Sequence, residues 1–234
     1  TLILTEVMRN FDCKKFIFSS SATVYGDPHT LPIKEDFPLL VSNPYGRSKL
    51  MIEEFLQDIF TADDSWRIAL LRYFNPVGAH QSGRIGEEPR GIPNNLMPYI
   101  AQVADGRRDQ LNIFGNDYET ADGTGARDYI HVVDLALAHI GALNQSKLDK
   151  FEILNIGGGK STTVLELIKS FEETSGVTIK FKYSPRRDGD LATFWADSSK
   201  SSEKMGWKPK RNIKKICEDT WRWHKLNPKG YGNR

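Results

Sequence analysis

Tyr45 and Lys49 are the residues whose types and spacing could do chemistry. They lie in the segment Asn-Pro-Tyr-Gly-Arg-Ser-Lys-Leu-Met, residues 43–51. On a helix, side chains four residues apart share one face, with Cβ atoms about 5–6 Å apart. A phenol beside an ammonium group is a candidate general base, because the cation favours the phenolate. The alternative is a solvated pair on a helix surface, and the spacing taken alone does not exclude it.

A phenol that acts as a base near neutral pH needs a large pKa shift. The reference pKa of a tyrosine is about 10, so a useful phenolate fraction requires a lowering of about 3 units, or ~4 kcal/mol. One nearby cation supplies roughly 1–3 units. Lys49 alone is therefore marginal, and a second positive charge, such as an oxidised nicotinamide ring, would close the gap.

The elements around this pair form a crossover unit. Pro44 suits the first turn of a helix, and apolar residues at helical spacing continue to Ile59. The apolar run 15–18 predicts a buried strand that ends in Ser19-Ser20-Ser21, and Arg67–Tyr73 predicts a second strand that ends at Phe74-Asn75. Ligands of open parallel sheets bind beyond the carboxyl ends of the strands. The sequence therefore predicts that these polar residues meet the Tyr45 helix in one crevice.

The predicted fold class is α/β, a Rossmann-like doubly wound parallel sheet with a smaller α+β lobe. We expect residues 1–76 to form the C-terminal part of a Rossmann domain and 77–234 the smaller lobe, with some segments returning to the sheet. The chain begins within a predicted helix, so we expect the N-terminal part of this fold to be absent from it. Further expected helices cover 96–104, 134–143, 164–171, 199–205 and 213–223, and further strands 111–114, 151–156 and 177–183.

Composition limits the classes of function. The 234 residues carry 32 basic and 30 acidic side chains, for a net charge of +2. The basic residues are scattered, so we expect no nucleic-acid partner. Cys13 and Cys217 match no metal spacing, which predicts no metal site and a reducing, cytoplasmic setting. No apolar run approaches the ~20 residues that span a bilayer, so no membrane association is expected.

A glycine-rich segment at residues 155–162 resembles the end of a phosphate-binding Walker A loop. The full pattern requires a glycine five residues before Gly159, and Leu154 occupies that position. We therefore expect a strand-to-helix turn here.

Several longer motifs carry a resemblance to a known family. They are Ser-Ser-Ser-Ala-Thr-Val-Tyr-Gly, Pro-Tyr-Gly-Arg-Ser-Lys, Leu-Leu-Arg-Tyr-Phe-Asn-Pro-Val-Gly-Ala-His, Gly-Ile-Pro-Asn-Asn-Leu-Met-Pro-Tyr, Asp-Gly-Thr-Gly-Ala-Arg-Asp-Tyr-Ile-His-Val and Pro-Arg-Arg-Asp-Gly-Asp. In this order they resemble the UDP-glucose 4-epimerases, which belong to the extended short-chain dehydrogenase/reductases. The resemblance covers essentially the whole chain but not the N-terminal dinucleotide fingerprint of that family.

The resemblance implies roles for the reaction and for the cofactor. Tyr45 matches the catalytic base, and Lys49 matches the lysine that lowers its pKa and binds the nicotinamide ribose. Ser21 matches the hydroxyl that binds the sugar 4-OH. Ser19 and Phe74 fall on the cofactor side, where Phe74 lines the nicotinamide pocket. NAD is the implied cofactor, which the resemblance assigns to the Rossmann part at 1–76, and it makes 77–234 the UDP-sugar-binding lobe.

The resemblance also implies the residues that bind the UDP-sugar. Arg127 and Arg187 match arginines that hold the diphosphate, a role that suits the bidentate guanidinium. Asp190 lies in the same loop and would orient the uridine end. Phe194 falls where the family bounds the sugar pocket, and we hypothesise that its bulk disfavours 2-N-acetyl sugars; the simpler interpretation is an aromatic core residue. The remaining expected substrate contacts are Asn75, Asn95 and Leu96.

The implied reaction interconverts UDP-glucose and UDP-galactose. Oxidation at sugar C4 by NAD gives a 4-keto sugar, which rotates about its diphosphate and is reduced again on the other face. The family also implies a homodimer through the Tyr45 helix and its neighbour. A 4,6-dehydratase is disfavoured, because Ala22-Thr23-Val24 supplies no carboxylate beside the strand-end hydroxyl. The alternative is an inactive fragment that retains at most UDP-sugar binding or dimerisation.

Overall fold

The structure is a computed structural model that describes residues 1–144 and 148–232. The chain divides into two compact units. The first contains Thr1–Phe74, Ala136–Gly159 and Ala196–Lys208, and the second contains Asn75–Leu135, Lys160–Trp195 and Pro209–Arg234.

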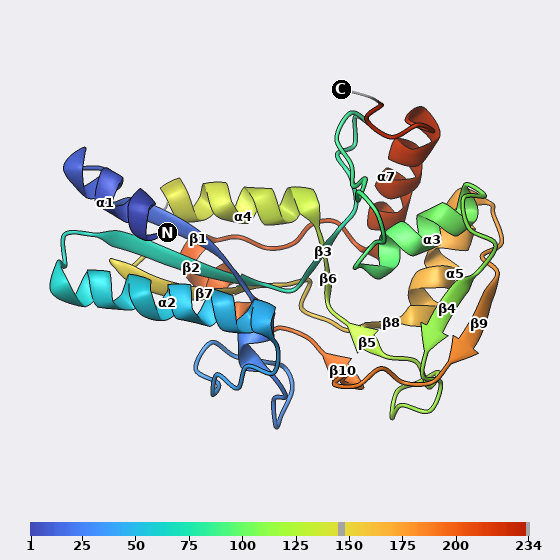
Figure 1. The fold of residues 1–234 in the computed structure, drawn as a ribbon, viewed down its shortest axis with the longest axis horizontal. Helices are drawn as coiled ribbons and strands as arrows, with labels where there is room; N and C mark the ends of the chain where they lie inside the picture. The colour runs from blue at the N-terminus through green and yellow to red at the C-terminus, as the bar shows by residue number, and fades with distance from the viewer. Residues whose placement is uncertain (145–147, 233–234) are drawn as a thin grey trace. The chain divides into compact units, whose positions relative to one another are not determined.

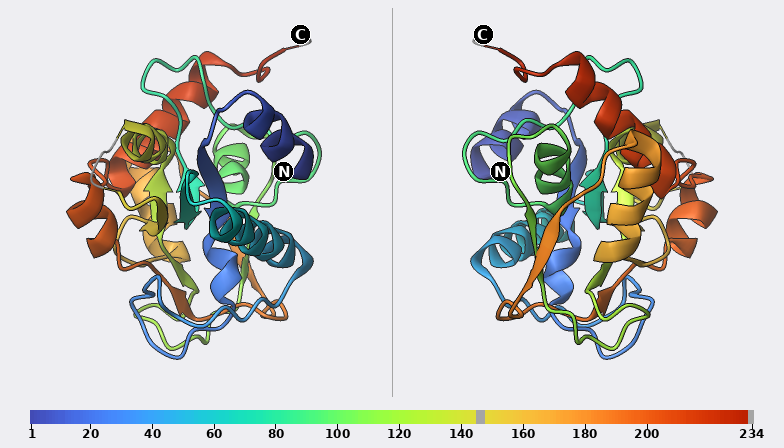
Figure 2. Two further views of the ribbon diagram at one scale, coloured as in Figure 1. Left: turned by 90° about the vertical axis from the view of Figure 1, so that its left-hand side faces the viewer. Right: turned by 90° about the vertical axis from the view of Figure 1, so that its right-hand side faces the viewer.

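The first unit is built on a parallel three-stranded sheet. Strands β1 (Lys15–Ser21), β2 (Arg67–Tyr73) and β7 (Phe151–Ile156) stand in the order β1-β2-β7. Helix α2 (Pro44–Ala62) and the part of α4 (Val132–Asn144) that belongs to this unit run along opposite faces of the sheet (Figures 1 and 2). The expected α/β fold with a parallel sheet is thereby confirmed.

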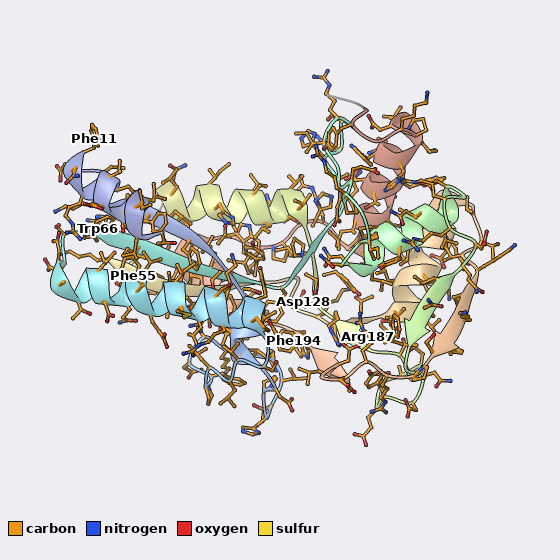
Figure 3. All side chains as sticks on the ribbon, in the orientation of Figure 1. Phe11, Phe55, Trp66, Asp128, Arg187 and Phe194 are labelled. Atoms are coloured by element: carbon orange, nitrogen blue, oxygen red, sulfur yellow. The ribbon has the colours of Figure 1, made fainter. Side chains whose placement is uncertain are left out.

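Helix α2 begins where the sequence predicts and buries one face. The side chain of Asn43 accepts a hydrogen bond from Gly46 N at 2.8 Å and caps the helix, and Pro44 occupies its first turn. Leu56 and Ile59 pack with Trp66 and strand residues in one hydrophobic cluster. Figure 3 shows Trp66 and Phe55 on the side of α2 that faces the strands.

Shorter elements complete this unit. Helix α1 (Leu2–Asn10) precedes β1, and the 3₁₀ helix η1 (Ala22–Tyr25) follows it directly. Helix α6 (Ser199–Met205) packs against β7.

The second unit combines short strands with three helices that share a core. Strand β3 (Asn75–Val77) pairs with β6 (Tyr129–His131), and β4 (Leu111–Phe114) pairs with β9 (Phe181–Ser184). Strand β5 (Ala126–Arg127) lies between β10 (Thr193–Phe194) and β8 (Thr162–Thr163). Helices α3 (Leu96–Ala104), α5 (Val164–Ser175) and α7 (Ile213–Leu226) contribute Met97, Ile100, Leu167, Phe171 and Ile216 to the core.

One predicted strand is shorter than expected. The sequence predicts a strand over 177–183, whereas β9 begins at Phe181. The backbone N–H of Ile179 donates to the Glu172 side chain at 2.7 Å, and the Ile179 side chain is buried in the core. These residues therefore join α5 to the strand, and only Phe181–Ser184 pair with β4.

Among the described residues, no helix combines the length and the apolar character needed to cross a membrane.

Candidate active site

Tyr45 and Lys49 lie together on the first turns of α2. Lys49 Nζ is 5.6 Å from the centroid of the Tyr45 ring and 5.2 Å from that of the Phe18 ring. The same ammonium group donates to Ser19 O at 2.9 Å, which ties the helix to the end of β1. Burial lowers the pKa of Lys49. Tyr45 is 53% exposed, so its phenol is accessible to a ligand.

The three serines at the end of β1 face different partners. Ser19 Oγ is 2.8 Å from His139 Nε2 on α4, whereas Ser20 Oγ donates to Glu53 on α2. Ser21 Oγ accepts from Thr23 N at 3.3 Å and from Thr23 Oγ1 at 3.0 Å, and so caps η1. Because side chains alternate along a strand, the β1 serines contact both helices that cover the sheet.

Gly46 allows the start of α2 to pack closely on the turn that follows Ser21. A Cβ atom at Gly46 would lie 3.0 Å from Thr23 O, 3.0 Å from Val41 Cγ1 and 3.2 Å from Thr23 Oγ1. Thr23 therefore touches both the Ser21 hydroxyl and the backbone next to Tyr45. Our sequence analysis missed this contact of Thr23 with α2. The convergence of Ser21 and Tyr45 on one ligand stays a prediction.

Two further residues near the strand ends, Tyr73 and His139, were also missed. Burial raises the pKa of Tyr73, with the nearby Tyr45 as a second cause, while a hydrogen bond with Ser19 acts in the opposite direction. The Tyr73 and His139 rings lie 6.3 Å apart. The position of Tyr73 at the end of β2 was the signal that could have indicated it.

Phe74 is almost fully buried, at 4% exposure, and its N–H donates to Ile156 O at 3.1 Å. Its expected contact with a nicotinamide ring stays a prediction.

The residues at this edge of the sheet fit the nicotinamide half of NAD. Lys49 carries three N–H donors, and among the described residues Ser19 O accepts one of them, so donors remain for ribose hydroxyls. The exposed Tyr45 ring stands at the carboxyl end of parallel strands, where such folds bind ligands. The glycine-rich turn that holds a dinucleotide pyrophosphate does not occur within these 234 residues.

The second unit contains a pocket of about 510 Å³ that gathers most of the predicted substrate residues. Its lining includes Asn75, Asn95, Leu96, Arg127, Arg187 and Asp190. Phe194 is partly buried in β10, pairs in register with Arg127, and is not among the described residues that line this pocket. Its hypothesised effect on 2-N-acetyl sugars stays a prediction.

Asp190 holds the two predicted diphosphate arginines in place. Its carboxylate accepts from Arg187 Nε at 2.8 Å and lies 3.7 Å from Arg127 Nη2. Arg127 Nη1 also donates to Leu191 O at 2.7 Å. Figure 3 shows Arg187 beside β5 in this unit. The two guanidinium groups are thus oriented before any ligand binds.

The pocket carries excess positive charge on aromatic supports. Its lining has three arginines and one aspartate, for a formal charge of +2. Arg187 lies 4.9 Å from the Phe114 ring centroid and Arg108 lies 4.7 Å from that of Tyr99. Such a surface complements a diphosphate anion. Sequence reasoning missed Arg108, Phe114 and Tyr99, because no single motif joins them.

Comparisons with known proteins agree with this geometry. The family described as GDP-mannose 4,6 dehydratase matches residues 1–220. The UDP-glucose 4-epimerase of Bacillus subtilis is 55% identical over 99% of this chain and 68% of its own length. The crystal structure of UDP-glucose 4-epimerase from Stenotrophomonas maltophila with bound NAD and formylated UDP-arabinopyranose has a TM-score of 0.94 at 46% identity, over 97% of this chain and 68% of its own.

This chain belongs to the UDP-glucose 4-epimerase family. The epimerase from Bifidobacterium longum, in complex with NAD+ and UDP, agrees with a TM-score of 0.92 at 49% identity, over 98% of this chain and 69% of its own. The chain thus spans about two thirds of the length of the epimerases that it matches. The broader family also contains dehydratases, but Ala22-Thr23-Val24 in this epimerase-family chain supplies no acid beside Ser21.

We predict that Gly46→Ala weakens the docking of α2. The added methyl would press on the backbone of Thr23, and overpacking of this kind costs about 1–3 kcal/mol, more than the ~1 kcal/mol that alanine gains over glycine in a helix. Thermal unfolding measures the change. Gly141→Ala is the matched control, because a Cβ at Gly141 meets only Met205 Sδ at 3.9 Å, so this variant should be stabilised. Equal stabilisation of both variants would contradict the close approach.

Proposed function

We propose that this chain carries the reaction centre and the UDP-sugar pocket of an NAD-dependent UDP-glucose 4-epimerase, which interconverts UDP-glucose and UDP-galactose. The observation that carries the proposal is the exposed Tyr45 phenol beside the Lys49 ammonium, at the strand end that also bears Ser21. Membership of the UDP-glucose 4-epimerase family supports it.

Tyr45 is the base in the proposed reaction. Its phenolic oxygen takes the proton of the sugar 4-OH, and the Lys49 ammonium group, 5.6 Å from the ring, places a positive charge beside it. Ser21 hydrogen-bonds the same hydroxyl, since Thr23 already donates to Ser21 Oγ and leaves the serine proton free to be donated. Bound NAD supplies the oxidation of C4 and the later reduction of the 4-keto sugar. Tyr45 returns the proton, so no net redox change occurs.

The second unit binds the part of the substrate that does not react. In this proposal Arg127 and Arg187 hold the diphosphate, and Asp190 keeps both guanidinium groups in position. Asn75, Asn95 and Leu96 contact the remainder of the UDP-sugar. Firm binding of UDP with few contacts to the hexose permits the keto sugar to rotate about the diphosphate link. That rotation is what exposes its opposite face.

The alternative is a chain that binds a UDP-sugar without turning it over. The charged pocket alone, with its formal charge of +2, would suffice for such binding. Turnover distinguishes the two functions, since binding requires only the second unit and epimerisation also requires Tyr45.

Tyr45→Phe is expected to abolish epimerisation while leaving UDP affinity near normal. The phenol has no role in holding UDP in this proposal, whereas general-base catalysis contributes typically 10²–10⁴-fold. Turnover of UDP-galactose and titration calorimetry with UDP measure the two effects in the full-length protein. Retained turnover would exclude Tyr45 as the base.

Arg187→Ala is expected to weaken UDP binding by roughly 10- to 100-fold, because a hydrogen bond to a charged group contributes about 1.5–3 kcal/mol. Arg186→Ala is the control: this neighbouring arginine pairs with Asp117 at 2.7 Å and is not among the described lining residues. Calorimetry with UDP compares the two. Equal losses for both variants would show that the effect is one of general charge and not of a diphosphate contact.

We further propose a homodimer in the cytoplasm. Apolar residues stand exposed on α1, just after it and on α2, namely Ile3 at 78%, Phe11 at 80% and Met51 at 57%. Figure 3 shows Phe11 directed away from the rest of the first unit. A second copy would cover this surface, and free cysteines suit a reducing compartment.

We expect light scattering to give twice the chain mass, and Met51→Asp to give the mass of one chain. Single-chain mass for the unmodified protein would contradict the dimer.

A further inference from the structure

A buried ion pair lies beneath the helix that carries Tyr45. Arg72 on β2 and Glu53 on α2 are 2% and 4% exposed. Arg72 Nη2 is 2.5 Å from Glu53 Oε2, and Arg72 Nε lies 3.0 and 3.1 Å from the two carboxylate oxygens. Two-pronged contacts of this kind fix direction as well as distance. The pair therefore joins α2 to the sheet at one rotation of the helix.

Further buried hydrogen bonds connect the pair to the residues around the serine strand. Ser20 Oγ donates to Glu53 Oε1, and Arg72 Nη1 donates to the Tyr25 hydroxyl at 3.1 Å. Tyr25 in turn donates to Asn155 Oδ1 at 2.7 Å. Burial raises the pKa of Tyr25 to about 12, so its hydroxyl remains a donor. The network thus spans all three strands of the sheet and η1.

Glu53 shares a helix face with the two residues of the proposed reaction. It lies four residues after Lys49 and eight after Tyr45, so all three side chains project toward the same side of α2. Ser20, which Glu53 binds, stands between Ser19, whose carbonyl accepts from Lys49, and Ser21. A slide or rotation of α2 on the sheet would therefore separate Glu53 from Arg72 and break this ion pair.

Stability alone does not explain a buried ion pair. Replacing such a pair with well-packed apolar residues is often neutral or stabilising, whereas removing one partner leaves an uncompensated buried charge. Apolar contacts are non-directional and tolerate small shifts. The N–H groups of Arg72, by contrast, donate to specific acceptors on Glu53 and Tyr25. These hydrogen bonds are all made in only one register of α2 on the sheet.

We propose that Glu53 and Arg72 are positioning residues for the epimerase reaction, which hold Tyr45 and Lys49 in register with Ser19 and Ser21. This inference rests on the proposed function for its effect on turnover, but the register itself is a property of the first unit. The two residues act through the helix and do not touch the substrate.

The test compares single and double substitutions in the full-length protein. Glu53→Gln leaves Arg72 buried without a counter-charge and should lower the melting temperature. Glu53→Leu combined with Arg72→Met removes both charges and should melt above the single variant. If the pair sets the register, the double variant should still lose about 100-fold in kcat, the order of loss that a 1 Å misplacement brings. Its KM for UDP-galactose and its affinity for UDP should stay within about threefold, because the pocket of the second unit is untouched.

Glu152→Gln is the matched control. Glu152 on β7 is also 4% exposed and pairs with Lys200 at 2.6 Å, but it contacts neither α2 nor the serines among the described contacts. This variant should lose stability and keep kcat. A double variant with an unchanged kcat, or a control with an equal loss of kcat, would overturn the proposal.

Hydrogen exchange gives a reading that does not depend on activity. Amides of residues 45–50 should exchange faster in the double variant than in the unmodified protein and in Glu152→Gln, at equal temperature below melting. Unchanged exchange would overturn the positioning role even if turnover fell. Suppose the unmodified protein shows no epimerisation, but residues 45–50 still exchange faster in the double variant. That result would contradict the proposed function and leave the register assignment standing.

Discussion

The docking of α2 onto the end of β1 is the constraint on which the reaction centre depends. Three contacts set it along the length of the helix. Gly46 permits close approach at the first turn, the Glu53–Arg72 pair fixes the middle, and Leu56 belongs to the hydrophobic cluster farther along. Apolar packing supplies the driving force. The polar contacts set the register of α2 on the sheet. In this account, that register determines whether the Tyr45 phenol and the Ser21 hydroxyl can bind the same sugar hydroxyl.

The two units divide the chemistry that an epimerase requires. The first unit presents a phenol, an ammonium group and a hydroxyl at the carboxyl end of a parallel sheet. The second presents guanidinium groups, of which Arg187 both pairs with Asp190 and lies over the Phe114 ring. A reaction that inverts C4 while the sugar stays attached to UDP needs a fixed reaction centre and a firm hold on the nucleotide. Few contacts to the hexose are then an advantage, since they allow it to rotate.

Local patterns predicted the elements but not the contacts between distant residues. The helical spacing after Pro44 and the apolar run before Ser19 located α2 and β1, because each depends on neighbours in the chain. The partner of Glu53 could not be predicted in this way, since Arg72 lies 19 residues away on a strand. Phe194 stays a prediction from the resemblance alone, because it is not among the described residues that line the pocket of the second unit. The shortened β9 follows likewise from the burial of Ile179 in the core that it shares with α3 and α7.

The central claim is that the Tyr45 phenol and the Ser21 hydroxyl act on one sugar carbon. A crystal structure of the full-length protein with NAD and a UDP-hexose measures this most directly. We expect Tyr45 Oη and Ser21 Oγ both within about 2.6–3.2 Å of the oxygen on C4. A complex in which the two groups contact different hydroxyls, or in which Tyr45 points away from the hexose, would contradict the account.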